Sequence, residues 1–147
     1  MPDTLDDQAV TDTVARFRRA TTDSDIPAIL DTLTEDAELI SPLSGRLVFR
    51  GHTDLTPLLT LIYRPRSHLR WTDTLGTGPT RVLLGEAKAG PFRMTEALVL
   101  TLTPTGRIHR LSPHLRPWPA LTAVAIYLGP SLLRYPGAIR RAASPKR

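Results

Sequence analysis

Residues 92–116 read FRMTEALVLTLTPTGRIHRLSPHLR, two runs of strand-favouring residues joined at Pro104-Thr105-Gly106. In the first run, large apolar residues share one parity: Met94, Leu98, Leu100 and Leu102. A period of two is typical of a strand with one buried face. Gly106 can adopt a positive φ, which allows the second run to fold back antiparallel. The stretch therefore predicts a hairpin that forms one wall of a hydrophobic interior.

Glu96 interrupts the apolar face of this predicted strand, between Met94 and Leu98. A carboxylate that points into a hydrophobic interior is costly unless it is paired or used. One interpretation is a functional carboxylate that moves a proton or holds a polar ligand group. The other is a structural ion pair with an arginine, for which Arg70 and Arg81 are candidates. The sequence leaves both interpretations open.

Length and composition predict one domain with a real core, because the chain has 147 residues, of which 41% are hydrophobic and 22% are charged. The absence of cysteine excludes disulfides and thiolate metal sites. The first residues, MPDTLDDQAV, are acidic and polar, unlike a secretory signal peptide. No apolar stretch of about 20 residues lacks Pro or Gly, so no spanning helix is expected. The default expectation is a cytoplasmic protein.

Charge is distributed unevenly along the chain. Residues 1–60 contain 5 basic and 11 acidic residues, a net of −6, whereas residues 61–147 contain 14 basic and 3 acidic residues, a net of +11. No acidic residue follows Glu96. A basic half can indicate nucleic acid or an anionic membrane as a partner. The 17 arginines are mostly scattered singly and aromatic residues make up only 5%, so no nucleic-acid partner is predicted.

The rest of the chain predicts three helices and an antiparallel sheet. The expected elements are helices over 4–20, 25–33 and after Gly51, and strands over 38–41, 46–50, 68–75 and 81–89, followed by the hairpin. Asp25 is expected to cap the second helix, and Thr56-Pro57 to form the cap and first position of the third. Helices that come early in the sequence, before most strands of an antiparallel sheet, indicate the α+β class.

A family resemblance lies in residues 15–42, ARFRRATTDSDIPAILDTLTEDAELISP. The two helices, the D-x-x-A-I/L motif, the E-D-A entry to the first strand and its terminal proline resemble the opening of the nuclear-transport-factor-2-like superfamily. Gly51 before a helix and Gly106-Arg107-Ile108 match later landmarks, and the similarity covers about residues 8–117. It implies a curved antiparallel sheet wrapped around three helices as a conical pocket. The implied domains are residues 1–117 and a C-terminal helix with a basic tail, residues 118–147.

The superfamily includes ketosteroid isomerases, SnoaL-like polyketide cyclases, limonene-epoxide-type hydrolases, dehydratases and members without catalysis. In the matching positions of the isomerases, the general base falls on Ser41, the tyrosine donor on Phe17 and the protonated Asp donor on Leu98. None of these side chains supplies the required chemistry unaided. The Asp-Arg-Asp arrangement of the epoxide hydrolases is also missing. Ketosteroid isomerisation is therefore not expected.

The candidate site residues follow from the strand register and the resemblance. Glu96 is the candidate acid/base, and His109, which shares the inward parity of the last strand, is a candidate catalytic partner. The expected ligand-binding residues are Phe17, Ser41, Tyr63, Trp71, Met94, Leu98, Leu100, Leu111 and Leu115. The four histidines form no i, i+4 pair, so no metal is expected, and no cofactor is predicted.

The tail contains an uncharged run over 117–133, followed by basic residues that include Arg134, Arg140 and Arg141. Pro119 can begin a helix that Gly129-Pro130 ends. We expect this helix to lie across the pocket mouth or the sheet, with residues 142–147 frayed. Its expected buried residues are Leu121, Val124, Ala125 and Leu128. The alternative is an amphipathic basic segment resting on an anionic membrane.

Together these observations predict a dimeric pocket domain for a small, largely apolar, polyketide- or isoprenoid-like molecule, whose catalysis is open. One alternative is a proton-transfer isomerase, cyclase or hydrolase with Glu96 as acid/base. Another is a non-catalytic dimeric interaction module that uses the outer sheet face or the basic tail. On the last strand, Arg110, Ser112, His114 and Arg116 are expected to face outward, on the surface that many relatives use to dimerise.

Overall fold

A computed structural model describes residues 4–63, 67–89, 91–116 and 118–144, without the side chains of residues 67, 89, 118–121, 123 and 124. Six strands form one curved, open sheet in the order β2-β1-β6-β5-β4-β3. The strands are β1 (Leu33–Ile40), β2 (Val48–Arg50), β3 (Ser67–Leu75), β4 (Thr80–Ala89), β5 (Phe92–Leu102) and β6 (Ile108–Arg116). The predicted antiparallel pairing holds for all neighbours except β1 and β6, which pair in parallel because the chain returns to β1 only after the β3–β6 strands.

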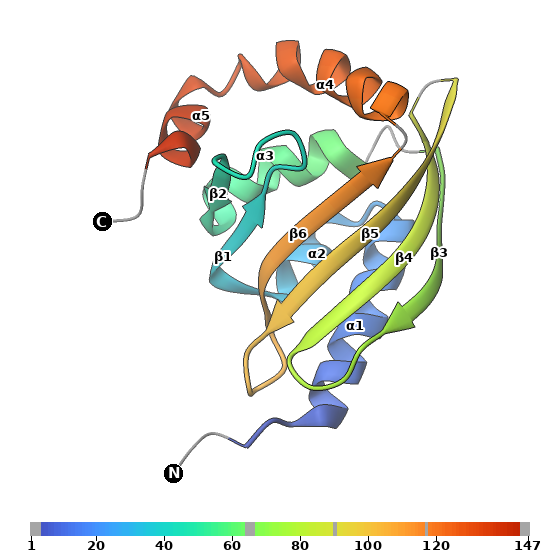
Figure 1. Ribbon diagram of the computed structural model, residues 1–147. Helices are drawn as coiled ribbons and strands as arrows, with labels where there is room; N and C mark the ends of the chain where they lie inside the picture. The colour runs from blue at the N-terminus through green and yellow to red at the C-terminus, as the bar shows by residue number, and fades with distance from the viewer. Residues whose placement is uncertain (1–3, 64–66, 90, 117, 145–147) are drawn as a thin grey trace.

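Helices lie at both ends of this sheet. They are α1 (Asp7–Thr22), α2 (Ile26–Asp31), α3 (Gly51–Tyr63), α4 (Trp118–Leu132) and α5 (Pro136–Ala143). In Figure 1, α1 and α2 lie behind the sheet, α4 crosses its upper end, and α5 lies on the side of the sheet where β2 forms the edge. This architecture confirms the predicted α+β class and the curved sheet of the conical fold.

Local capping explains the start of the first two helices. The Asp6 carboxylate accepts a hydrogen bond from the Ala9 amide at 3.0 Å, and the Asp25 carboxylate accepts one from the Ala28 amide at 3.2 Å. Such side-chain acceptors satisfy amides that have no partner within the helix. The predicted cap at Asp25 is therefore confirmed. Leu33 was expected on the second helix, but it begins β1, because there it pairs with Ile108 of β6.

Two helices extend past prolines that were expected to bound them. α3 begins at Gly51 rather than at Thr56, so Pro57 lies inside it. The helix buries Leu55, Leu58 and Leu59, and this burial of apolar side chains compensates for the backbone hydrogen bond that Pro57 cannot donate. α4 continues through Pro130 to Leu132. Only two helical residues follow Pro130, so the backbone hydrogen bond that Pro130 cannot donate is missing only from the last turn.

The tail also contains a second helix, α5, that the sequence pattern did not indicate. Ala138 and Ala142 of α5 are buried, so residues 142 and 143 are helical rather than frayed. In α4, Leu128 is buried and Ala125 is half-buried. The side chains of Leu121 and Val124 lie outside the described residues. Among those that are described, no helix is long and apolar enough to cross a membrane.

The hairpin of β5 and β6 follows the predicted alternation. Burial on β5 alternates from Met94 to Leu102, with Glu96 on the buried face. Gly106 at the turn has a φ of 86°, and a Cβ there would lie 2.7 Å from the Ala9 side chain. The turn therefore requires glycine both for its conformation and for the close approach of α1.

Candidate functional site

An interior cavity of about 50 Å³ lies between the concave sheet face, α3 and α4. Its lining is mainly apolar and comes from Leu39, Ser41, Pro42, Leu43, Phe49, Leu58, Ile62, Tyr63, Glu96, Leu98, Leu111, Pro113, Leu115, Leu128 and Leu132. The polar side chains of this lining are Ser41, Tyr63 and Glu96. A carboxylate and two hydroxyls therefore share one hydrophobic chamber.

Glu96 is positioned by the sheet on both sides of β5. It lies opposite Gly85 of β4 and Leu115 of β6, and it is only 4% exposed. Its two predicted ion-pair partners bind elsewhere: Arg81 contacts the Asp7 carboxylate at 2.7 Å, and Arg70 contacts Glu86 at 3.3 Å. Glu86 itself faces the outer surface, opposite Thr95.

Glu96 lies in a row of residues across neighbouring strands that also contains Gly85 of β4 and Trp71 of β3, and this row is packed tightly. Gly85 also pairs with Trp71 of β3, and a Cβ on Gly85 would lie 2.6 Å from the Trp71 ring. The indole nitrogen of Trp71 donates a hydrogen bond to the Thr21 hydroxyl at 2.8 Å. Trp71 therefore occupies the space that a side chain at position 85 would need, and α1 holds its ring in place.

α4 closes the wide end of the cavity through Leu128 and Leu132. A volume of about 50 Å³ is far below the roughly 300–1,000 Å³ of pockets that hold drug-sized ligands. It is close to the space of one or two water molecules. The structure therefore represents a closed arrangement, in which any larger ligand requires displacement of the leucine side chains or of α4 itself.

The structure brings together some of the sequence-predicted ligand residues. Ser41, Tyr63, Leu98, Leu111 and Leu115 line the cavity. The others lie outside its lining: Phe17, Trp71, Met94 and Leu100. Phe17 and Leu100 are fully buried in the main core, whereas Met94 packs with Ala87 in a small separate cluster.

His109 does not line the cavity, because a β-bulge changes the parity of β6. Leu102 lies opposite Ile108, but Thr101 lies opposite Arg110, so His109 is the extra residue. Ile108 and Leu111 are therefore both buried, although their spacing is three. The Nδ1 atom of His109 is buried and has no hydrogen-bond partner among the described residues. Simple alternation cannot locate such a bulge.

The residues that the sequence interpretation missed belong mainly to α3, α4 and the β1–β2 connection. They include Pro42, Leu43, Leu58, Ile62 and Leu132. Leu58 and Ile62 were recognised as a buried helix face, and only the fold shows which part of that face meets a cavity. Leu132 lies beyond the proline that was expected to end its helix.

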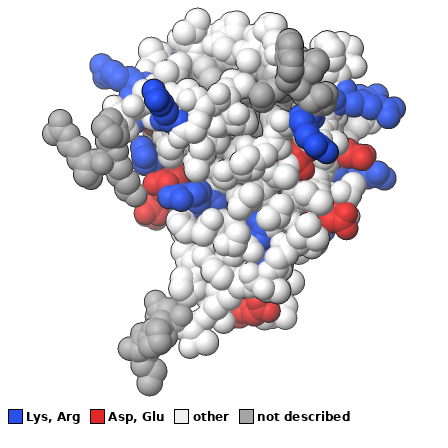
Figure 2. Space-filling view, in the orientation of Figure 1, with Lys and Arg blue, Asp and Glu red and all other residues white. Residues whose placement is uncertain are grey.

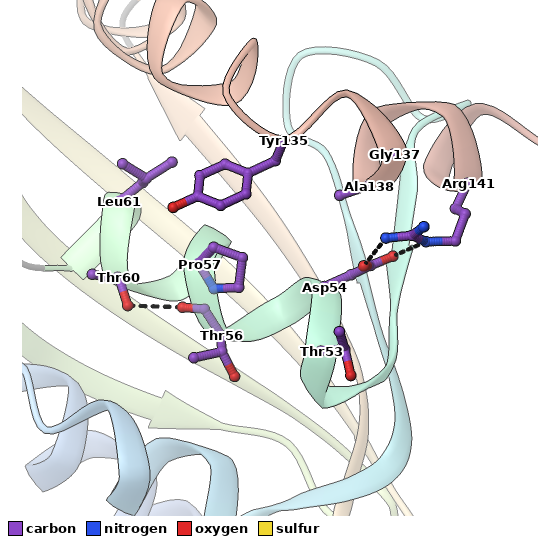
Figure 3. Close-up of a pocket in the computed structure, with 10 residues that line it drawn as sticks. All are labelled: Thr53, Asp54, Thr56, Pro57, Thr60, Leu61, Tyr135, Gly137, Ala138 and Arg141. Atoms are coloured by element: carbon purple, nitrogen blue, oxygen red, sulfur yellow. Dashed lines mark hydrogen bonds and ion pairs between the residues drawn. The ribbon is translucent and has the colours of Figure 1, made fainter.

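A second hollow lies on the surface between α3 and α5, as Figure 3 shows. This groove has a volume of about 680 Å³. At one end the Arg141 guanidinium binds the buried Asp54 carboxylate through two hydrogen bonds, of 2.6 and 3.0 Å. These bonds and the Asp54 charge raise the pKa of Arg141. This ion pair with two hydrogen bonds joins α5 to α3.

The described residues contain no group of three or more His, Cys, Asp or Glu side chains that could hold a metal ion.

The sequence matches no protein-family model, and a search of curated proteins gives no match. Solved structures are similar in shape. An uncharacterised protein with a cystatin-like fold from Silicibacter pomeroyi has a TM-score of 0.81 at 21% identity, covering 88% of this chain and 93% of that chain. A steroid Δ-isomerase from Pseudomonas aeruginosa has a TM-score of 0.78 at 20% identity, covering 88% and 96%. An NTF2-like protein from Burkholderia xenovorans has a TM-score of 0.63 at 20% identity, covering 82% and 98%.

Proposed function

Because the chain has the nuclear-transport-factor-2-like fold of these structures, we propose that it is a small-molecule pocket domain with a largely apolar ligand. The observation that carries this proposal is the placement of Glu96 in a mainly apolar interior chamber. In a ligand site, such a carboxylate orients a hydroxyl or carbonyl of a mainly hydrocarbon molecule.

The lining supports a polyketide- or isoprenoid-like ligand. Leu98, Leu111 and Leu115 from the sheet face Leu58 and Ile62 from α3 across the chamber, which suits flat or branched hydrocarbon. Ser41 and Tyr63 offer hydroxyl groups that can bond to one or two ligand oxygens. Entry requires the lining leucine side chains or α4 to move outward, because the closed cavity is too small for such a molecule.

The proposal is tested by thermal melting of the protein with isoprenoid alcohols and with aromatic polyketides. A ligand at about 100 times its Kd stabilises the folded state by about 2.7 kcal/mol. We expect Glu96→Gln to reduce this ligand-induced shift and Leu98→Phe, which fills the chamber, to abolish it. Glu86→Gln is the matched control, because Glu86 lies on the adjacent strand and faces outward; it should leave the shift unchanged.

Two results would oppose the proposal. The first is the absence of a shift with every compound, or a shift that Leu98→Phe leaves intact. The second is a loss of about 3–5 kcal/mol in Glu96→Gln with an unchanged ligand response, because removing one partner of a buried ion pair has a cost of that size. The second result would make Glu96 a structural residue.

A second candidate function is proton transfer on the same ligand class, with Glu96 as acid/base. It is favoured by the presence of the Ser41 and Tyr63 hydroxyls in the same chamber as the carboxylate, because such groups can share a proton with a reacting oxygen. Conversion of a bound compound by the wild type, lost in Glu96→Gln while binding persists, would support this candidate. Binding without any conversion would indicate that the protein carries or senses the compound.

A further inference from the structure

α4 presents an unusual surface for a helix at the outside of a protein. Its 15 residues, Trp118–Leu132, contain no charged side chain. A helix that is apolar around its whole circumference is normally covered on all sides. In α4, Leu128 and Leu132 face the cavity, but Ile126 and Tyr127 are 70% and 51% exposed. One face of the helix therefore caps the chamber while another contacts solvent.

The exposed face continues beyond the helix. Thr122, Ile126, Pro130 and Leu133 follow one another at intervals of four, four and three, and all four are exposed. Leu133 is 73% exposed. We call Ile126, Tyr127, Pro130 and Leu133 the apolar stripe. Contiguous apolar surface of this kind marks a contact site rather than ordinary exposure.

Basic side chains flank the apolar stripe at both ends. Arg116 ends β6 just before α4, and Arg134 and Arg140 follow it; all three are exposed. No acidic residue occurs after Glu96 in the sequence. In Figure 2 the uncharged upper surface, where Figure 1 places α4, has Lys and Arg side chains on both sides, and Asp and Glu side chains lie lower in this view.

We propose that the apolar stripe docks on an anionic lipid bilayer, with α4 lying in the interface plane. Aliphatic side chains then enter the acyl boundary, Tyr127 lies at headgroup level, and the flanking arginines bind lipid phosphates. At 15 residues, α4 is shorter than the about 20 residues that a spanning helix needs. A second copy of the chain fits less well, because it would bring the same basic rim against itself. The inference does not depend on what the cavity binds.

The experiment is flotation of the full chain with vesicles of phosphatidylcholine alone and with about 30 mol % phosphatidylglycerol. We expect binding to the anionic vesicles that weakens as salt rises. Arg134→Gln with Arg140→Gln should lower the partition coefficient about fivefold per arginine on anionic vesicles. Ile126→Ser with Leu133→Ser should lower it on the order of tenfold per residue. The controls are Leu75→Ser, an exposed leucine on β3, and Arg16→Gln with Arg19→Gln on α1, which should bind like the wild type.

A second measurement needs only one substitution at a time, at an exposed position, and so disturbs the fold less than the double variants. The chain has no cysteine, so a polarity-sensitive dye can be attached to Ile126→Cys or, as a control, to Leu75→Cys. Anionic vesicles should shift the emission of the dye at position 126 to the blue and leave the dye at position 75 unchanged. The proposal is wrong if the wild type does not float with anionic vesicles, or if the α1 arginine control weakens binding as much as the Arg134 and Arg140 pair. It is also wrong if the stripe variants bind vesicles normally and lose only self-association in light scattering.

Discussion

Leu128→Ala tests whether α4 is fastened to the domain through the face that covers the cavity. Leu128 is 8% exposed and belongs to the cavity lining. Removing its side chain forfeits about 1.5–3 kcal/mol of burial and enlarges the void beneath the helix. Because Leu128 lies at the mouth, where α4 can relax inward, the cost should stay near the lower end of the 2–5 kcal/mol seen for buried leucines. We expect a loss of about 2–3 kcal/mol.

The matched control is Ile126→Ala, two residues away on the same helix. Ile126 is 70% exposed, and alanine is a good helix former, so this change should stay within about 0.5 kcal/mol. Urea unfolding followed by circular dichroism measures both variants. The reasoning is refuted if the two variants lose equal stability, or if Leu128→Ala loses none. Either result would mean that α4 does not pack over the chamber in solution.

Three further predictions follow from the sheet and its site. Self-association should use the outer sheet face, where Val99 lies between Val82 and Ser112; light scattering should show a dimer that Val99→Arg converts to a monomer, and a wild-type monomer at micromolar concentration would contradict this. Pure protein should not isomerise Δ5-3-ketosteroids, since Ser41, Phe17 and Leu98 lack the base and both oxyanion donors; robust turnover would show that the positions were matched wrongly. Gly85→Ala should cost about 1–3 kcal/mol by overpacking against Trp71, and Trp71→Leu in the same chain should relieve most of that penalty; equal costs in both backgrounds would rule out the clash.

The alternation of apolar residues was enough to predict the wall of the chamber. A period of two is a local property of β5, and it predicted the inward side of Glu96 without knowledge of its neighbours. His109 shows the limit of the same rule, because the bulge on β6 is imposed by pairing with β5 and has no local signature. The order of the first nine elements was also readable, since caps such as Asp25 and turn residues such as Gly106 act within a few positions.

The composition of the chamber was less predictable than its wall. Leu128 was expected to be buried by a helix across the pocket mouth or the sheet, but Leu132 lies beyond Pro130 and was not expected to reach the cavity. Proline rules placed a boundary at Pro130, but tertiary packing of the helix outweighs one missing hydrogen bond. The pairing of Asp54 with Arg141 joins residues separated by 87 positions, and nothing in the two local sequences indicates that they meet.

The parallel pairing of β1 with β6 has a consequence for how the protein is made. Glu38 and Arg110, which lie opposite each other in these strands, are separated by 72 residues. At about 5–20 residues per second, a ribosome needs roughly 4–14 s to add that length. During this interval, the edge of β1 that will meet β6 has no native partner, and open strand edges are sites of aggregation. The nascent chain therefore cannot complete its sheet until almost the whole domain has been synthesised, and chains that stop short of β6 should be targets for chaperones or proteolysis.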